Sequence, residues 1–280
     1  MSRHPPELPP AWACGYGDDQ YGLFADLRVD LVKQRFRWIP PGRFWMGSPE
    51  SEGGRYDHEG PQHEVTLGAG FWLADAACSQ AFWLAVVGGV NPARFSDDLE
   101  CPVEQVSWEV VMQRFVPTLQ ARLEQEAMVD LPSEAEWEYA CRAGTPTPFH
   151  FLGESLSAAQ ANFDGNYPYG GAARGEYRRR TVPVKSSVPV KSFEPNAWGL
   201  TQMHGNVREW CRDGRRTYAE AAVEDPEGPL ETGLRALRGG SWIDDARDLR
   251  AAYRCFPHAG YRYQDTGFRC VLRPRTSPSG

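Results

Sequence analysis

The sequence has no apolar stretch long enough to cross a membrane, and its first ten residues lack the apolar core of a secretion signal. We therefore expect a cytoplasmic protein without a membrane partner. It also lacks an excess of basic charge, because 30 Lys and Arg against 37 Asp and Glu give a net charge of −7. A chain of this charge has no general attraction for polyphosphates, so no nucleic-acid partner is expected.

Several motifs that carry chemistry are also missing. The seven cysteines are scattered and include no C-x-x-C pair, so neither a zinc ribbon nor a secreted disulfide framework is indicated. No G-x-S-x-G, P-loop or G-x-G-x-x-G stands in a strand-to-helix context. His58 and His63, with Asp57 and Glu59, have the composition of a metal cluster, but their spacing in a polar loop favours solvated side chains.

The chain does have abundant core-forming side chains. Of its 280 residues, 41% are hydrophobic and 12% aromatic, which is enough for a large core. Residues 1–36 are expected to form an N-terminal arm and short strands packed on the domain, which spans 37–280. Period-two alternation between Leu23 and Trp38 predicts two short strands before the Pro40-Pro41-Gly42 turn.

Serine caps predict three helices. Ser79 suits the start of a short helix, and Ser107 suits the start of a longer one that Pro117 should kink or break. Ser133 and Glu136 have the spacing of a capping box, which is the clearest helix start in the chain. The second half is dense in Gly, Pro, Asn, Trp and Tyr, which predicts loops packed by aromatic side chains around a few short strands.

Eight short motifs, in one order between about residues 38 and 272, resemble the formylglycine-generating enzyme and related sulfatase-modifying-factor domains. They are Ile39-Pro-Pro-Gly-Arg-Phe-Trp-Met-Gly47, Pro61-Gln-His-Glu-Val65, Pro102-Val-Glu-Gln-Val-Ser-Trp108, Leu131-Pro-Ser-Glu-Ala-Glu-Trp-Glu-Tyr-Ala140, Asn196-Ala-Trp-Gly-Leu200, Gly205-Asn-Val-Arg-Glu-Trp210, Arg238-Gly-Gly-Ser-Trp242 and Gly267-Phe-Arg269. The resemblance implies an irregular, loop-rich, C-type-lectin-like α+β fold with few helices and short antiparallel strands. Five tryptophans in these motifs are expected to anchor the core: Trp108, Trp137, Trp198, Trp210 and Trp242.

At the active site of that family, the resemblance reveals two departures. The enzymes bind copper through two cysteines that follow the Gly-Gly-Ser-Tyr/Trp motif, because Cu(I) prefers soft thiolate ligands. Asp244 and Leu249 occupy those positions here, and the next sulfur, Cys255, stands alone. Arg208 stands where family members commonly carry tryptophan. We therefore expect no copper, no required cofactor and no catalytic residues.

Relatives in this family hold structural calcium with carboxylate, amide and backbone oxygens, which are the ligands that this ion prefers. The resemblance implies one calcium set formed by Asn162, Phe163 and Glu176. It implies a second set formed by Gln202, Gly205, Val207 and Glu209. Gln202 stands where asparagine is usual, and Glu209 has an alternative role as a buried hydrogen-bond acceptor.

Residues 238–269 resemble the variable region of diversity-generating retroelement target proteins, in which a fixed frame alternates with positions that adenine-directed mutagenesis varies. The expected frame is Gly239, Gly240, Ser241, Trp242, Leu249, Arg250, Arg254, Arg262, Gly267, Phe268 and Arg269. The expected ligand-binding positions are Ile243, Asp244, Asp245, Arg247, Asp248, Tyr253, Cys255, Phe256, Pro257, His258, Tyr261, Tyr263 and Asp265. The residues at all thirteen positions are compatible with codons that end in a pyrimidine, as the mutagenesis of AAC or AAT codons requires, although Gln264 interrupts the pattern.

These observations favour a non-catalytic protein that binds a protein or another macromolecule through residues 243–266. Large aromatic side chains and charged groups on a packed scaffold are typical of recognition surfaces. Two alternatives remain open: an enzyme of the family that performs oxygen-dependent oxidation or peptide modification, and a structural subunit. The sequence leaves the ligand and the oligomeric state undefined.

Overall fold

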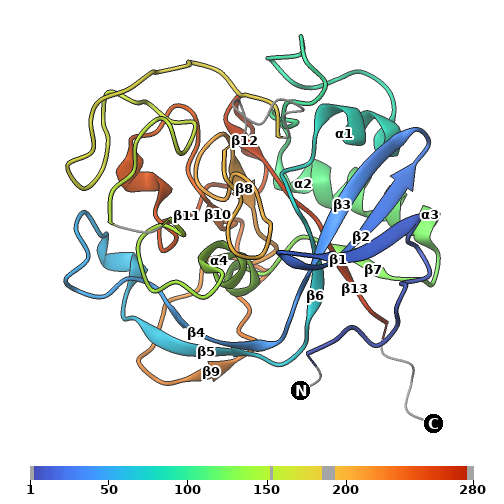
Figure 1. The fold of residues 1–280 in the computed structure, drawn as a ribbon, viewed down its shortest axis with the longest axis horizontal. Coiled ribbons are helices and arrows are strands. Elements are labelled where there is room, and N and C mark those ends of the chain that lie inside the picture. The colour runs from blue at the N-terminus through green and yellow to red at the C-terminus, as the bar shows by residue number, and fades with distance from the viewer. Residues whose placement is uncertain (1–2, 152–153, 185–192, 276–280) are drawn as a thin grey trace.

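The two strands predicted before the Pro40-Pro41-Gly42 turn belong to a six-stranded sheet. We describe a computed structural model of the chain over residues 3–151, 154–184 and 193–275 (Figure 1). The sheet has the order β1-β2-β3-β6-β13-β7, and all of its pairs are antiparallel. Its strands are β1 (Gly15–Asp19), β2 (Gly22–Val29), β3 (Val32–Ile39), β6 (Phe71–Ala74), β7 (Met128–Asp130) and β13 (Val271–Arg273).

The N-terminal residues are part of this sheet and contribute to its core. β1 pairs with β2 at the edge of the sheet. β3 runs without a break through residues 36 and 37, where the expected N-terminal arm meets the expected domain. Trp12 packs edge-on against Phe36 and Trp72, with ring centroids 5.5 and 5.7 Å away. β13 lies between β6 and β7, so the last strand of the chain joins strands from its first half (Figure 1).

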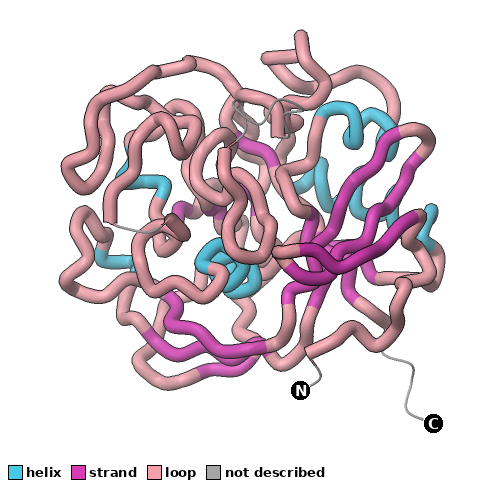
Figure 2. Tube along the Cα trace, in the orientation of Figure 1, coloured by secondary structure: helices cyan, strands magenta, loops and turns pink. Residues whose placement is uncertain are grey.

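Two smaller sheets and long loops form the other half of the molecule (Figure 2). One sheet has the order β11-β10-β8-β12, and the other has the order β4-β5-β9. The strands of the first are β8 (Arg208–Trp210), β10 (Leu237–Arg238), β11 (Arg254–Cys255) and β12 (Thr266–Gly267). The strands of the second are β4 (Gly42–Met46), β5 (His63–Leu67) and β9 (Val223–Glu224).

All three predicted helix starts are confirmed. Ser79 caps α1 (Gln80–Val87), and its hydroxyl accepts the backbone N–H of Phe82. Ser133 and Glu136 form the predicted capping box of α4 (Glu134–Arg142). Each serine side chain satisfies a backbone donor that has no partner within the helix.

The helix expected to break at Pro117 instead continues through it. Ser107 caps α2 (Trp108–Val110), which continues as a π-helical turn over Val111–Phe115 and then as α3 (Val116–Leu123). Pro117 stands in the first turn of α3, where the missing N–H of proline is tolerated. Widening the preceding turn to π geometry lets the chain absorb the proline without interruption.

Of the five tryptophans predicted to anchor the core, three are buried. Trp137 and Trp210 are fully buried and Trp242 is nearly so, whereas Trp108 and Trp198 are half-buried. The indole N–H of Trp210 donates to Val106 O at 2.9 Å, and that of Trp242 donates to Gln264 O at 3.1 Å. Across the described residues, no helix is both long and apolar enough to cross a membrane.

Candidate functional site

The segment 238–269 is fixed to the scaffold by buried arginines that pair with carboxylates. Arg250 donates to Glu52 and Glu59, at 2.7 and 2.6 Å, and both acids lie in the polar loop 48–62. Arg254 pairs with Glu134 of α4 through Nε at 2.7 Å. Burial alone would lower the pKa of Arg250, but the two carboxylates raise it overall, so the guanidinium stays charged. Such paired charges hold the segment in one conformation.

The thirteen candidate positions differ in their exposure. Five are exposed: Ile243, Asp245, His258, Tyr261 and Tyr263. Six are half-buried: Arg247, Asp248, Tyr253, Cys255, Phe256 and Pro257. Asp244 and Asp265 are buried. Every expected frame residue is buried except Arg262, which is exposed.

Asp244 and Asp265 are buried candidate positions, and both pair with Arg208. The guanidinium of Arg208 donates to both carboxylates, and Ser241 Oγ donates to Asp244 at 2.8 Å. Burial raises the pKa of Asp244 to about 6, although Arg208 opposes the shift. The two departures seen in the sequence, at positions 208 and 244, therefore compensate each other in an ion pair.

The resemblance places the family's copper-binding cysteines at the positions of Asp244 and Leu249. Leu249 is fully buried and packs with Phe149, Leu156 and Phe163 in a hydrophobic cluster. Cys255 is half-buried, and burial raises the pKa of its thiol to about 12. An ion-paired carboxylate, a core leucine and a protonated thiol cannot supply two soft anionic ligands.

The polar loop 48–62 contributes side chains that the sequence alone did not reveal. The ring of Tyr56 lies 5.6 Å from that of Tyr253, and the Tyr56 hydroxyl donates to Asp248 at 3.0 Å. The guanidinium of Arg247 lies 3.9 Å above the Tyr56 ring. The ring of His58 is stacked with the Tyr56 ring, and the two centroids lie 5.6 Å apart. In the sequence, this contribution was indicated only by the presence of an aromatic residue, Tyr56, in an otherwise polar loop.

A small pocket of about 320 Å³ adjoins the candidate segment. It is lined by Asn166, Tyr167, Pro168, Tyr169, Arg174, Asp245 and Arg247. The backbone N–H of Asp164 donates to Asp244 O, and that of Ala246 donates to Tyr167 O, so the loop 164–174 runs beside the segment. This loop is a second source of surface side chains that the motifs did not indicate.

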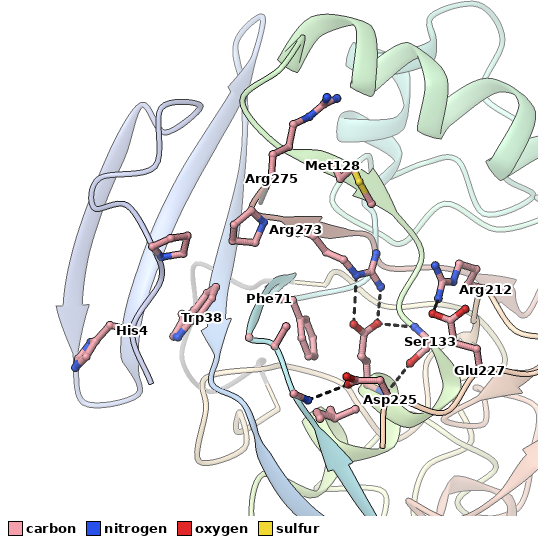
Figure 3. A pocket seen from close by; sticks show the side chains of 17 residues that line it. His4, Trp38, Phe71, Met128, Ser133, Arg212, Asp225, Glu227, Arg273 and Arg275 are labelled. Carbon is pink, nitrogen blue, oxygen red and sulfur yellow. Dashed lines mark hydrogen bonds and ion pairs between the residues drawn. The ribbon is translucent and has the colours of Figure 1, made fainter. Parts of the chain in front are cut away.

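A larger pocket, of about 780 Å³, lies near the two chain ends and includes none of the thirteen candidate positions (Figure 3). Trp38, Phe71 and Met128 supply apolar lining (Figure 3). Four of its charged groups form ion pairs with one another: Arg273 pairs with Glu136 at 2.6 Å, and Arg212 pairs with Glu227. A ligand that binds Arg273 or Arg212 would have to compete with these carboxylates.

The second calcium set does not fit the ion. Both carboxylate oxygens of Glu209 accept hydrogen bonds from Arg269, and one also accepts the indole N–H of Trp137 at 2.7 Å. Gln202 Oε1 accepts from Asn206 Nδ2 at 2.5 Å, and the N–H of Gly205 bonds Gly239 O. The Arg269 guanidinium already neutralises the Glu209 carboxylate, so a calcium ion would have to displace it.

The first calcium set is closer to what the ion requires. Asn162 is buried, and its side-chain carbonyl oxygen has no hydrogen-bond partner within the described part of the chain. Phe163 follows it in the interior and can offer only its backbone oxygen. Glu176 is exposed and lies 3.4 Å from Arg178 Nε, so this carboxylate would have to leave its ion pair.

Comparison with known proteins decides the family. Residues 28–274 match the model of the sulfatase-modifying factor enzyme 1-like domain. The chain belongs to that family. The formylglycine-generating enzyme of Thermomonospora curvata is 30% identical over 221 residues, which cover 72% of this chain and 68% of that enzyme.

Other family relatives have different names. The serine/threonine-protein kinase pkn1 of Chlamydia pneumoniae is 35% identical over 145 residues, which are 50% of this chain and 20% of the kinase. The inactive C-alpha-formylglycine-generating enzyme 2 of Bos taurus is 31% identical over 208 residues, which are 72% of this chain and 58% of that protein. The chain thus spans only a fifth of the length of the kinase.

The solved structure of Treponema denticola variable protein 1 has the same fold. It superposes with a TM-score of 0.76 and 23% identity, and the match covers 90% of this chain and 99% of that one. The irregular, C-type-lectin-like α+β fold expected from the motifs is confirmed.

Proposed function

We propose that the chain is a non-catalytic binding protein whose ligand is a protein or another macromolecule. The observation that carries the proposal is the ion pair between Arg208 and Asp244, which stands with Leu249 in place of the family's copper-binding thiolates. The relative from Bos taurus that is named inactive is a precedent for a member without the enzymatic reaction.

We assign ligand binding to a recognition surface formed by the solvent-accessible candidate positions and their neighbours in the loops 48–62 and 164–174. Ile243 and Tyr261 are both 37% exposed and Tyr263 is 47% exposed, and the rings of the two tyrosines lie 6.3 Å apart, so segment 238–269 presents neighbouring aromatic side chains to solvent. Buried arginines hold the segment that carries them, so little backbone entropy is lost on binding.

The finer form of the proposal is that these positions are diversified by a retroelement. The separation between a buried frame and accessible candidate positions supports it, with Arg262, Asp244 and Asp265 as the exceptions. The surrounding DNA tests it: a reverse-transcriptase gene and a template repeat that differs at adenines are expected. A cytoplasmic location and calcium bound by Asn162, Phe163 and Glu176 also remain proposals.

An enzyme of the family is the second candidate, because relatives such as that of Thermomonospora curvata are named formylglycine-generating enzymes. An enzymatic reaction in this chain would need metal ligands other than the pair of cysteine thiolates.

Selection from a phage-displayed library of random dodecapeptides tests the recognition surface. Peptides selected on the full chain should lose at least about tenfold in affinity for a Tyr261→Ser/Tyr263→Ser variant, as is typical for aromatic contact residues. Tyr16→Ser is the matched control, because Tyr16 is also exposed but lies on β1. Peptides that bind all three proteins equally would refute the assignment of this surface.

A further inference from the structure

Around Trp242, exposed arginines rest on aromatic rings. The ring of Trp242 packs edge-on against Phe95 at 5.6 Å and is stacked with Tyr177 at 6.2 Å. The guanidinium of Arg94 lies 5.8 Å from the Phe95 ring, and that of Arg179 lies 5.4 Å from the Tyr177 ring. Both arginines are exposed. Each guanidinium therefore lies near one ring, Phe95 or Tyr177, and that ring packs against Trp242 of segment 238–269.

A third exposed arginine joins the same surface from the loop 164–174. Arg174 lines the 320 Å³ pocket together with Asp245 and Arg247. Hydrogen bonds from Asp164 N to Asp244 O and from Ala246 N to Tyr167 O tie this loop to the segment that follows Trp242. We call Arg94, Arg174 and Arg179 the arginine triad.

The triad arginines differ from Arg178 and Arg180, whose guanidinium groups are paired with carboxylates. Arg178 pairs with Glu176 at 3.4 Å, and Arg180 pairs with Asp97. None of the three triad arginines forms an ion pair with any residue that the structure describes. Exposed guanidinium groups without a carboxylate are available to a partner, and the planar fork of arginine matches a carboxylate with two parallel hydrogen bonds.

The aromatic supports favour binding through these side chains. Contact with a ring restricts a guanidinium before the partner arrives, so less side-chain entropy is lost in the complex. Arginine beside tyrosine and tryptophan is also the composition that dominates the energetics of protein interfaces. The triad thus combines available charge with partial preorganisation.

A protein partner fits this surface better than a nucleic acid does. Exposed carboxylates lie among the arginines, including Asp97, Asp98 and Asp245, and the whole chain has a net charge of −7. A continuous phosphate backbone would meet these negative groups along with the arginines. A folded or peptide epitope can place one carboxylate opposite each guanidinium and avoid the acids.

We infer that the recognition surface, extended around Trp242 by Arg94 and Arg179, binds an acidic protein epitope, in which Asp or Glu side chains pair with Arg94, Arg174 and Arg179. This inference rests on the proposed function and specifies the chemistry of its partner. Binding should weaken as salt concentration rises, because the contacts are between exposed charges.

The phage-displayed dodecapeptide library is again the probe, with the full chain and an Arg94→Glu/Arg174→Glu/Arg179→Glu variant as targets. Peptides selected on the unmodified chain should be enriched in Asp and Glu, and they should bind the triple variant at least about tenfold more weakly. Arg28→Glu is the matched control, because Arg28 is exposed on β2, outside this surface. It should leave binding unchanged, and all variants should retain the melting temperature of the parent.

The outcomes separate this inference from the proposed function. Selected peptides that depend on Tyr261 and Tyr263 but show no acidic enrichment would overturn the inference and leave the binding function intact. Acidic peptides that tolerate the triple variant would also overturn it. Tighter binding of single-stranded oligo(dT) than of any acidic peptide, with loss in the triple variant, would instead assign the triad to nucleic acid.

Discussion

Side chains in segment 238–269 fall into two classes that respond differently to truncation. Leu249 and Phe268 are fully buried, so replacing either by Ala should leave a cavity and lower the free energy of unfolding by about 2–5 kcal/mol. Tyr261→Ser and Tyr263→Ser remove exposed rings and should change it by no more than about 0.5 kcal/mol. Urea unfolding of the four variants measures both. If the tyrosine variants lose as much stability as Leu249→Ala, these rings belong to the core.

Two further aromatic residues of the segment do not belong with the freely exposed tyrosines. Tyr253 contacts Tyr56, and Phe256 lies 6.3 Å from the His58 ring and 4.6 Å from the Arg254 guanidinium. Both are half-buried, so their truncation should affect stability as well as binding. From the sequence, these two rings and those of Tyr261 and Tyr263 were all predicted to bind ligand, because residue type does not reveal which neighbours cover a side chain.

Arg208 neutralises two buried acids, and its removal should be costly. Arg208→Met would leave Asp244 and Asp265 without their cation and should lower the free energy of unfolding by about 3–5 kcal/mol. Adding Asp244→Asn and Asp265→Asn to that variant should restore much of the loss, because no buried charge then remains unpaired. Chemical unfolding of the single and triple variants would show this. Equal instability of both would contradict a compensating ion pair.

Glu104 gives the fold a defined pH dependence. Its side chain is fully buried, only Oε1 has a hydrogen-bond partner within the described residues, and burial raises its pKa to about 7. A raised carboxyl pKa means that the folded state binds the proton more tightly. The stability from this group is therefore complete below about pH 4.5 and is lost as pH rises to about 7.

Comparison with Glu104→Gln isolates this effect from that of other titrating groups. Glutamine imitates the protonated acid, so the variant should gain roughly 3 kcal/mol relative to the parent between pH 4.5 and pH 7.5. Unfolding in denaturant at the two pH values gives the difference. A stability gap that does not change with pH would show that Glu104 titrates normally.

At the scale of elements, the loop 48–62 and the segment 246–250 act as one unit. Glu59 is fully buried, and its carboxylate accepts from Arg250, from the Ser48 hydroxyl and from the backbone of Tyr56. Glu59→Ala should lower the free energy of unfolding by about 3 kcal/mol, because Arg250 loses its principal partner. Hydrogen exchange should rise in both elements together. Faster exchange in the loop alone would mean that the segment is held by other contacts.

Local sequence signals predicted the elements better than the contacts between them. The capping residues Ser79 and Ser133 identified two helices because a cap is encoded within four residues. β1 was not distinguished from an extended arm, since its pairing with β2 is tertiary information. Pro117 was expected to break a helix, but a π-helical turn accommodates it.

At the scale of the whole molecule, ordered motifs predicted the family and fold, whereas the site was only partly predictable. Asp244 and Arg208 were recognised as departures, but their mutual ion pair depends on how β8 meets the loop after β10. The contributions of Tyr56 and Arg174 depend on loops brought to the segment from elsewhere in the chain. Long-range packing of this kind has no signature in a single sequence.

We propose that this chain uses the scaffold it shares with formylglycine-generating enzymes to bind a macromolecular ligand, without the oxygen-dependent reaction. Oxygen uptake by the full chain, supplied with Cu(I) and a cysteine-containing peptide, tests this claim most directly, with an active formylglycine-generating enzyme measured in parallel. Because Asp244 and Leu249 replace the thiolate pair, uptake should not exceed that of Cu(I) and peptide alone, and no formylglycine should form. Turnover comparable to that of the active enzyme would contradict the account.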